Sequence, residues 1–180
     1  MQKSDNNLIA PLFDRALDSI GNTPMLKVTR LDTGCCELFL KLENQNPGGS
    51  IKDRIGKSMI EAAVADGKVA PGGTLIEATA GNTGLGLALV AAQMGFKLIL
   101  VVPDKMAQEK IFHLKALGTD VRLTRSDVGK GHPEYYQDLA LPYIRKHQVP
   151  SISISLKTLP TQKPILKLLG LKYGNRWAGN

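Results

Sequence analysis

Residues 74–124 alternate between short apolar segments and segments with helical spacing, and this alternation constrains the fold most strongly. Phe96 to Val102, F-K-L-I-L-V-V, is an almost continuous apolar run, which is typical of a strand covered on both faces. The spacing predicts further strands at 74–79 and 120–124, and helices at 85–94 and 108–117. This order predicts an α/β fold, a three-layer sandwich whose helices cover a mostly parallel sheet.

The residues before this unit predict four more elements. Apolar residues at helical spacing predict a helix at 11–20, ended by Gly21. Extended segments are expected at 25–28 and 37–43, and a further helix from Asp53 to the Asp66-Gly67 turn.

The loop at Asn46 to Arg54, N-P-G-G-S-I-K-D-R, places a lysine at the start of that helix. Ser50 is the expected N-cap, with Asp53 completing a capping box. A cation is unfavourable at a helix N-terminus, because the helix dipole and the free N–H groups there prefer anions. Lys52 therefore either points into water from a well-capped helix or has a chemical task.

A second glycine loop, A-T-A-G-N-T-G at 78–84, follows a predicted strand and opens a helix. Ligands of open α/β sheets bind at this end of a strand. The loop is either an ordinary strand-to-helix turn or a cradle for an anion such as a carboxylate. Its spacing is G-x-x-G-x-G, which departs from the dinucleotide-binding pattern G-x-G-x-x-G.

Together the two loops identify a family resemblance. They are followed by V-P-D-K-M-A-Q-E-K and L-K-A-L-G-T-D-V, and preceded by I-G-N-T-P-M. These ordered motifs, spread over about residues 12–140, closely resemble the cysteine synthase and cystathionine β-synthase family. Members of that family are pyridoxal-phosphate enzymes of fold type II.

The resemblance implies a role for each site residue. Lys52 is implied to form the Schiff base with pyridoxal 5'-phosphate, and such a lysine must be uncharged to attack an aldehyde. Asn82 is implied to bind the ring hydroxyl of the cofactor. The substrate-binding residues implied for the carboxylate are Thr79, Gly81, Asn82 and Thr83. Many members have serine where this chain has Ala80, which leaves the exact substrate open.

The reaction implied by the resemblance is a β-replacement. O-acetylserine or serine loses its β-substituent after Lys52 takes the α-proton, and a sulfur nucleophile is added to give cysteine. A cystathionine β-synthase reaction between serine and homocysteine is the alternative. The family is usually homodimeric. A non-catalytic remnant or binding module is the competing class of function.

The net charge of +7 comes entirely from the end of the chain. Residues 1–140 hold 16 basic and 16 acidic side chains, whereas residues 141–180 hold seven basic and no acidic ones. A basic tail can bind nucleic acid or a membrane, but this one lacks a regular pattern, so we expect neither partner.

Other features indicate a cytoplasmic protein. No apolar run reaches the ~18 residues needed to span a bilayer, and the first residues lack a secretory signal pattern. Cys35 and Cys36 are adjacent, which suits neither a disulfide framework nor a metal site.

The family completes its site with residues beyond position 140, among them a glutamine in N-Q-F-x-N-P-x-N and a loop for the cofactor phosphate. Residues 141–180 show neither. Read one base out of frame, with codon degeneracy used freely, Lys146 onward can be translated as T-P-G-A-F-Y-I-N-Q-F-E-N-P-A-N-P. We therefore hypothesise a frameshift near Ala140.

Three regions follow from this hypothesis. Residues 1–44 are expected to belong to a larger, mostly missing domain. Residues 45–140 are expected to form a small α/β domain with the lysine and the asparagine loop. Residues 141–180 are expected to be an aberrant basic tail. The 180-residue chain is then expected to be truncated and inactive, with weak cofactor binding or none.

Overall fold

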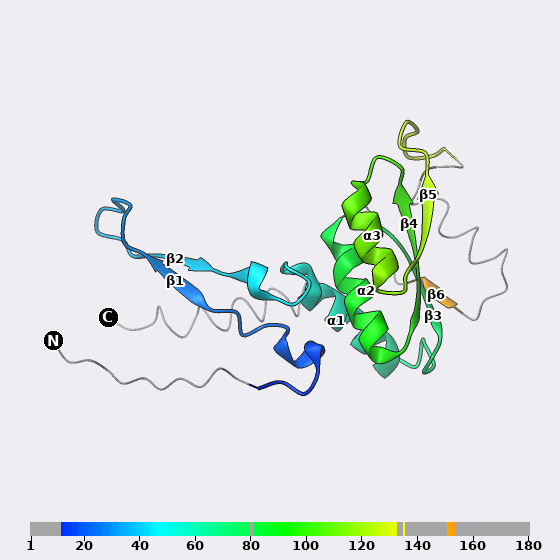
Figure 1. The fold of residues 1–180 in the computed structure, drawn as a ribbon, viewed down its shortest axis with the longest axis horizontal. Coiled ribbons are helices and arrows are strands. Elements are labelled where there is room, and N and C mark those ends of the chain that lie inside the picture. The colour runs from blue at the N-terminus through cyan, green and yellow to red at the C-terminus, as the bar shows by residue number, and fades with distance from the viewer. Residues whose placement is uncertain (1–11, 80, 133–134, 136–150, 154–180) are drawn as a thin grey trace.

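A four-stranded parallel sheet forms the centre of the computed structural model, which describes residues 12–79, 81–132, 135 and 151–153 (Figure 1). The strand order is β5–β4–β3–β6. The strands are β3 (Thr74–Ala78), β4 (Lys97–Pro103), β5 (Asp120–Thr124) and β6 (Ser151–Ser153). The α/β class and the parallel sheet predicted from the sequence are thus confirmed.

Three helices cover one face of this sheet: α1 (Lys52–Ala65), α2 (Asn82–Met94) and α3 (Gln108–Ala116) (Figure 1). The chain adds β4 beside β3 and then β5 beside β4, always in the same direction. Right-handed crossovers that advance in one direction place their helices on one face. The helical layer expected on the other face lies outside the described residues.

The hydrophobic core lies between these helices and the sheet. Its central members come from the middle of β4 and from the inner faces of α1 and α2. The buried core residues are Leu17, Met59, Ile60, Ala63, Val69, Leu75, Leu87, Ala88, Val90, Ala91, Leu98, Leu100, Val102, Met106, Ile111 and Leu114. The run Phe96 to Val102 was apolar because β4 is an inner strand.

Helix ends follow the glycine signals in the sequence. Gly95 after α2 and Gly118 after α3 both adopt positive φ, at 73° and 79°, which glycine accepts without strain. The start of α2 differs from the prediction, because the helix begins at Asn82 and not at Leu85. The residues expected to form a turn are therefore its first helical turn.

The helix predicted at 11–20 is wrong in length and type. Only Ala16–Ser19 is helical, as the 3₁₀ turn η1. Leu17 is buried in the core, but Leu12 is 95% exposed and Phe13 is also exposed. A short helix gains most of its stability from packing an apolar face, and in this segment Leu17 is buried in the core while Ile20 packs against it only partly buried.

An antiparallel hairpin, β1 (Met25–Val28) and β2 (Leu38–Lys41), extends away from the α/β unit (Figure 1). A short 3₁₀ turn, η2 (Glu43–Gln45), follows it. The register sorts its side chains into two faces. One face, here called the aliphatic face, holds Leu26, Val28, Leu38 and Leu40, and the other holds Met25, Lys27, Phe39 and Lys41.

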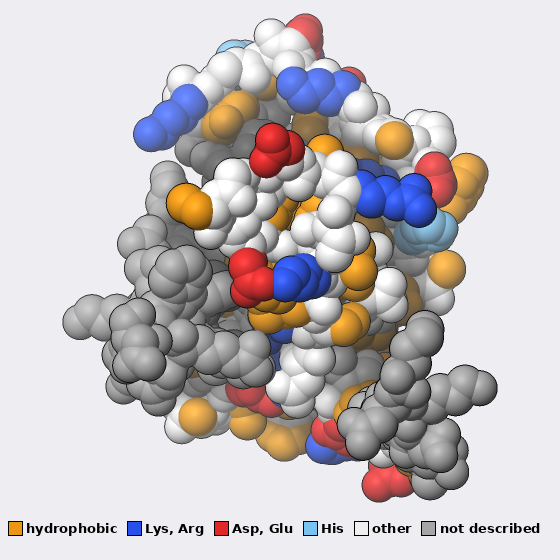
Figure 2. All heavy atoms as spheres, turned by 90° about the vertical axis from the view of Figure 1, so that its left-hand side faces the viewer, with side chains coloured by type: hydrophobic (Ala, Val, Ile, Leu, Met, Phe, Trp, Pro, Cys, Tyr) orange, Lys and Arg blue, Asp and Glu red, His pale blue; other side chains and the backbone are white. Residues whose placement is uncertain are grey.

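Much of the hairpin is open to solvent. Of the aliphatic face, Leu26, Leu38 and Leu40 are exposed, and so is Phe39 on the opposite face. Viewed from the hairpin end, the surface shows hydrophobic side chains between charged ones (Figure 2).

Strand β6 was not predicted. Ser151–Ser153 pairs with β3 in parallel, with Ile152 opposite Leu75. The alternation S-I-S-I-S at 151–155 suits a strand, although the surrounding residues gave no pattern. The helix considered at 133–140 lies outside the described residues. Within the described part of the chain, no helix is long and apolar enough to cross a membrane.

Candidate active site

The hydrogen bonds of the loop before α1 differ from those of the predicted capping box. The hydroxyl of Ser50 accepts the N–H of Lys52 at 3.2 Å, but Ile51 occupies the N-cap position. The carboxylate of Asp53 accepts the N–H of Gly48, where a capping box would place the N–H of Ser50. The chain reverses at Gly49, whose φ of 78° favours glycine, and this turn brings Gly48 over the start of the helix.

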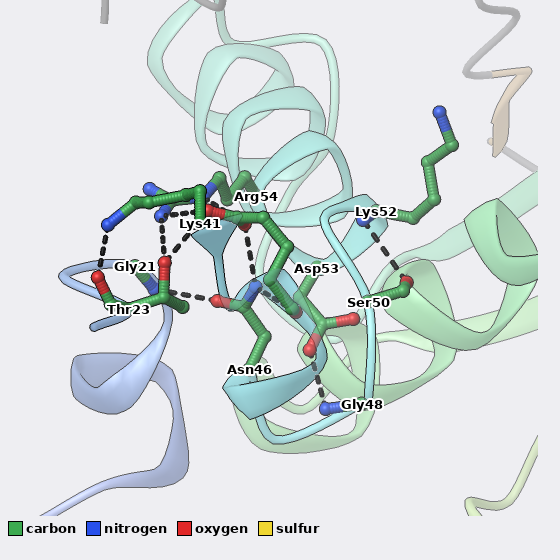
Figure 3. A network of polar contacts seen from close by, with 10 residues as sticks. Gly21, Thr23, Lys41, Asn46, Gly48, Ser50, Lys52, Asp53 and Arg54 are labelled. Atoms are coloured by element: carbon green, nitrogen blue, oxygen red, sulfur yellow. Dashed lines mark hydrogen bonds and ion pairs between the residues drawn. The ribbon is translucent and has the colours of Figure 1, made fainter. Parts of the chain in front are cut away.

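Lys52 is the first residue of α1, and its side chain extends away from the polar groups that surround the loop (Figure 3). The residue is half-buried. Within the described residues, its ammonium nitrogen has no hydrogen bond and no ion pair. A cation at a helix N-terminus without a partner is not explained by stability, as the sequence already indicated.

Two glycines bring α1 and α2 into backbone contact. A Cβ atom added to Gly56 of α1 would lie 2.6 Å from the carbonyl oxygen of Gly86 in α2. A Cβ added to Gly86 would lie 2.6 Å from the carbonyl oxygen of Lys52. The helices can cross this closely only because neither residue has a side chain. The crossing holds the backbone of Lys52 against the first turns of α2.

The predicted substrate-binding residues lie together where β3 ends and α2 begins. Thr79 is buried, and its N–H donates to the carbonyl of Val101 on β4 at 3.2 Å. Gly81 is the N-cap of α2, and a Cβ there would meet no atom of the described residues within 4 Å, so this part of the chain leaves space beside the loop. Asn82 is exposed and Thr83 is half-buried.

Lys110 contacts this loop and had no role in the sequence analysis. Its ammonium group, in the first turn of α3, donates to Oδ1 of Asn82 at 3.3 Å. With Oδ1 engaged, the Nδ2 group of Asn82 remains available as a donor to a ligand. The residue lies within the motif V-P-D-K-M-A-Q-E-K, but spacing alone does not show that α3 places it beside α2.

Glu77 is a second residue that the sequence analysis did not single out. It lies on β3 directly opposite Leu100, on the face that packs against the helices. Its Oε1 accepts the N–H of Ala78, while Oε2 has no partner among the described residues. Burial raises the pKa of the Glu77 carboxyl to about 8. The group is therefore mostly protonated near neutral pH.

These features fit a ligand that carries both a carbonyl group and an anion. Lys52 offers an amine without a partner, which is the group that attacks an aldehyde. The N–H groups at the start of α2 favour an anion, and the open space at Gly81 leaves room for one. The site residues are therefore compatible with pyridoxal phosphate and an amino-acid carboxylate.

Comparison with known proteins agrees with this chemistry. A cysteine synthase from Flavobacterium sp. is 50% identical over 129 residues, which cover 71% of this chain and 42% of that protein. A cystathionine beta-synthase from Dictyostelium discoideum is 46% identical over 130 residues, covering 72% of this chain and 26% of that protein. The chain thus spans less than half the length of these relatives.

A solved structure shares the fold as well. The hydrogen sulfide-producing enzyme from Fusobacterium nucleatum superposes with a TM-score of 0.75 at 36% identity, over 90% of this chain and 55% of that one. Residues 16–146 match the family described as "Pyridoxal-phosphate dependent enzyme". The two glycine loops, the lysine in the first of them and the parallel sheet therefore have a common explanation: the chain belongs to the family of pyridoxal-phosphate-dependent enzymes.

Proposed function

We propose that this chain provides the lysine and the asparagine loop of a β-replacement enzyme in sulfur amino-acid biosynthesis. The observation that carries the proposal is the crossing of α1 and α2 at Gly86, which joins the backbone of Lys52 to the helix that Asn82 opens. Both glycine loops of the sequence thereby belong to one structural unit. The names of the relatives support cysteine synthesis, and O-acetylserine or serine is the proposed donor.

In this proposal each residue has a distinct task. Lys52 Nζ would hold pyridoxal 5'-phosphate at its aldehyde carbon and would move the proton at the substrate α-carbon. The cofactor supplies an electron sink when bound. Asn82 Nδ2 would donate to the ring hydroxyl of the cofactor. Thr79, Gly81, Asn82 and Thr83 bind the substrate carboxylate at the start of α2.

A cystathionine β-synthase reaction remains the second candidate, because relatives of that name match 72% and 77% of this chain. The two candidates differ in the nucleophile, sulfide against homocysteine. Presenting O-acetylserine, O-phosphoserine and serine with each nucleophile to a frame-corrected protein distinguishes them. In either case the assembled enzyme is proposed to be a cytoplasmic homodimer.

For the 180-residue chain itself we propose weak cofactor binding and no turnover. The groups that would hold the cofactor phosphate were expected beyond position 140, in the segment proposed to be frameshifted. Sequencing the gene tests the frameshift, since codons that forbid the alternative reading would exclude it. If the lost segment is essential, the chain is a non-catalytic remnant of the enzyme.

The test of the site is spectroscopic. The chain is mixed with pyridoxal 5'-phosphate, and an absorption band near the visible edge is recorded for the wild type, Lys52→Ala and Lys68→Ala. We expect a weak band that disappears only in Lys52→Ala. Lys68 is the control because it is an exposed lysine, paired with Asp66 after the end of α1. A band that persists in Lys52→Ala would contradict the assignment, and strong binding with turnover would contradict the proposed incompleteness.

A further inference from the structure

Glu43 and Arg54 form a bidentate ion pair beside the start of α1. Nε of Arg54 donates to Oε2 of Glu43 at 2.8 Å, and Nη2 donates to Oε1 at 2.9 Å. The two side chains are only 14% and 16% exposed. Hydrogen bonding from Arg54 lowers the pKa of the Glu43 carboxyl to about 2. The carboxylate is therefore ionised at ordinary pH, and the planar guanidinium fixes its orientation.

Thr23 and Asn46 extend this pair into a network. The hydroxyl of Thr23 donates to Oε1 of Glu43 at 2.8 Å, and Nδ2 of Asn46 donates to Oε2 at 2.9 Å. Oδ1 of Asn46 accepts the N–H of Gly21 at 2.9 Å. The loop at 46–51, which precedes Lys52, is here called the lysine loop. The network thus joins the turn at 21–23, the start of the lysine loop and the first turn of α1 (Figure 3).

The loop between Asn46 and α1 contains two adjacent glycines, Gly48 and Gly49. Glycine has the least restricted backbone conformation of any residue. Asn46 is 3% exposed and holds the beginning of the loop. Asp53 holds Gly48, and Arg54 holds the helix that follows. Lys52 lies between these contacts and takes no part in them through its side chain.

Lys52 and Arg54 leave the helix in different directions. Residues two apart on an α-helix are separated by about 200° around its axis. Accordingly, Arg54 points into the network while Lys52 extends to the other side (Figure 3). The network therefore influences Lys52 only through the backbone.

We propose that Glu43, Asn46, Thr23 and Arg54 are positioning residues that fix the lysine loop, so that Lys52 is presented to the cofactor in one orientation. The inference rests on the proposed function, since it assigns the network to the reactivity of Lys52. It also assigns a role to the turn at Gly21 to Thr23, which is distant in sequence from the lysine. Loosening the network should lower the reactivity of Lys52 without unfolding the sheet.

The experiment compares the wild type with Glu43→Gln, with the milder variant Thr23→Val, and with the control Asp127→Asn. Asp127 forms a two-pronged pair with Arg125 that is exposed and remote from the loop in sequence. Each protein is treated with pyridoxal 5'-phosphate below saturation and reduced with borohydride, and the adduct at Lys52 is measured by peptide mass spectrometry. Amide hydrogen exchange of peptides 46–52 and 97–103 is measured without cofactor.

We expect Glu43→Gln to lower the Lys52 adduct at least fivefold and to speed exchange in peptide 46–52, with peptide 97–103 unchanged. Thr23→Val should show a smaller effect of the same kind, and Asp127→Asn should show none. Unchanged adduct in Glu43→Gln and Thr23→Val overturns the inference, even if exchange rises. If the wild type forms no adduct at Lys52, the frame-corrected protein is compared in the same way: no adduct there contradicts the proposed function, and unchanged adduct in its Glu43→Gln variant overturns the inference.

Discussion

Gly86 lies so close to Lys52 that a Cβ atom on Gly86 would be 2.6 Å from the Lys52 carbonyl oxygen and 2.8 Å from its carbonyl carbon. The atoms of Lys52 that would clash with this Cβ belong to the backbone, so they cannot move away by a rotamer change as a flexible side chain could. The position of Lys52 thus depends on a residue 34 positions later having no side chain.

Gly86→Ala should therefore push α1 and α2 apart. We expect it to lower the free energy of unfolding by about 1–3 kcal/mol or more, as overpacking in a close-packed core does. Urea denaturation followed by circular dichroism measures the change. Gln93→Ala, at an exposed position of the same helix, should change stability by less than about 0.5 kcal/mol. Equal stability of Gly86→Ala and wild type would show that the helices are not in backbone contact.

Gly48→Ala should disturb the other side of the lysine loop. A Cβ on Gly48 would lie 2.5 Å from Oδ1 of Asp53, whose carboxylate is fully buried. We expect a loss of about 1–3 kcal/mol in unfolding free energy and faster proteolysis within 46–51. Gly129→Ala is the control, because a Cβ there would meet no described atom within 4 Å. Similar proteolysis of both variants would contradict the prediction.

Glu77 should make the protein less stable as the pH rises. Its pKa is about 8 in the folded chain against an ordinary value of 4.5, so the unfolded chain loses the proton first. Stability contributed by the neutral carboxyl is complete below pH 4.5 and is lost as the pH rises to about 8. Glu77→Gln cannot ionise, so it should be more stable than wild type at pH 8, by a few kcal/mol at most.

The measurement is urea denaturation from pH 4 to pH 9, with Glu61→Gln as the control. Glu61 is an exposed glutamate of α1. We expect the difference between Glu77→Gln and wild type to grow across this range, while Glu61→Gln follows wild type. A difference independent of pH would indicate that Glu77 is ionised in the folded protein.

Glu43 should have the opposite pH dependence. Its pKa is about 2 in the folded chain, so the stability that its charge contributes is present above pH 4.5 and is lost as the pH falls to about 2. Glu43→Gln should lose about 1.5–3 kcal/mol at pH 7, the usual range for hydrogen bonds to charged groups. Below pH 3 its stability should approach that of the wild type.

The control for this prediction is Glu37→Gln, which removes a charge from the exposed pair with Lys27. Exposed pairs contribute at most about 1 kcal/mol. Acid titration of the folded fraction compares the two variants. If Glu37→Gln and Glu43→Gln have the same acid profile, the buried pair is no stronger than a surface pair.

The order of strands and helices could be predicted because local signals in the sequence, such as apolar runs and helix-ending glycines, indicate it. Strand β5 was predicted at its observed bounds, Asp120–Thr124, since Gly118 ends the preceding helix and the strand follows at once. The run in β4 is apolar because the strand is buried between neighbours. The start of α2 was missed, because Asn82 and the glycines after it have the composition of a turn although they form a helix.

The glycines of α2 also show what spacing alone misses. Gly84 faces the side chains of Thr79 and Leu100, and Gly86 faces Lys52, so both serve close packing inside a helix. In the sequence, the spacing of these glycines had to be compared with a dinucleotide-binding loop, from whose pattern it departs. Likewise, the pair of Glu43 and Arg54 joins positions 11 apart, and the contact of Lys110 with Asn82 joins positions 28 apart. Such contacts depend on tertiary packing, so no local pattern predicts them.

The aliphatic face of the hairpin has a practical consequence. Leu26, Val28, Leu38 and Leu40 form a surface that attracts other apolar surfaces. The α/β unit encloses most of its apolar residues, although Val64, Phe112 and Leu123 are exposed on it. At high concentration we therefore expect the hairpin to take part in association between molecules while the sheet is still folded.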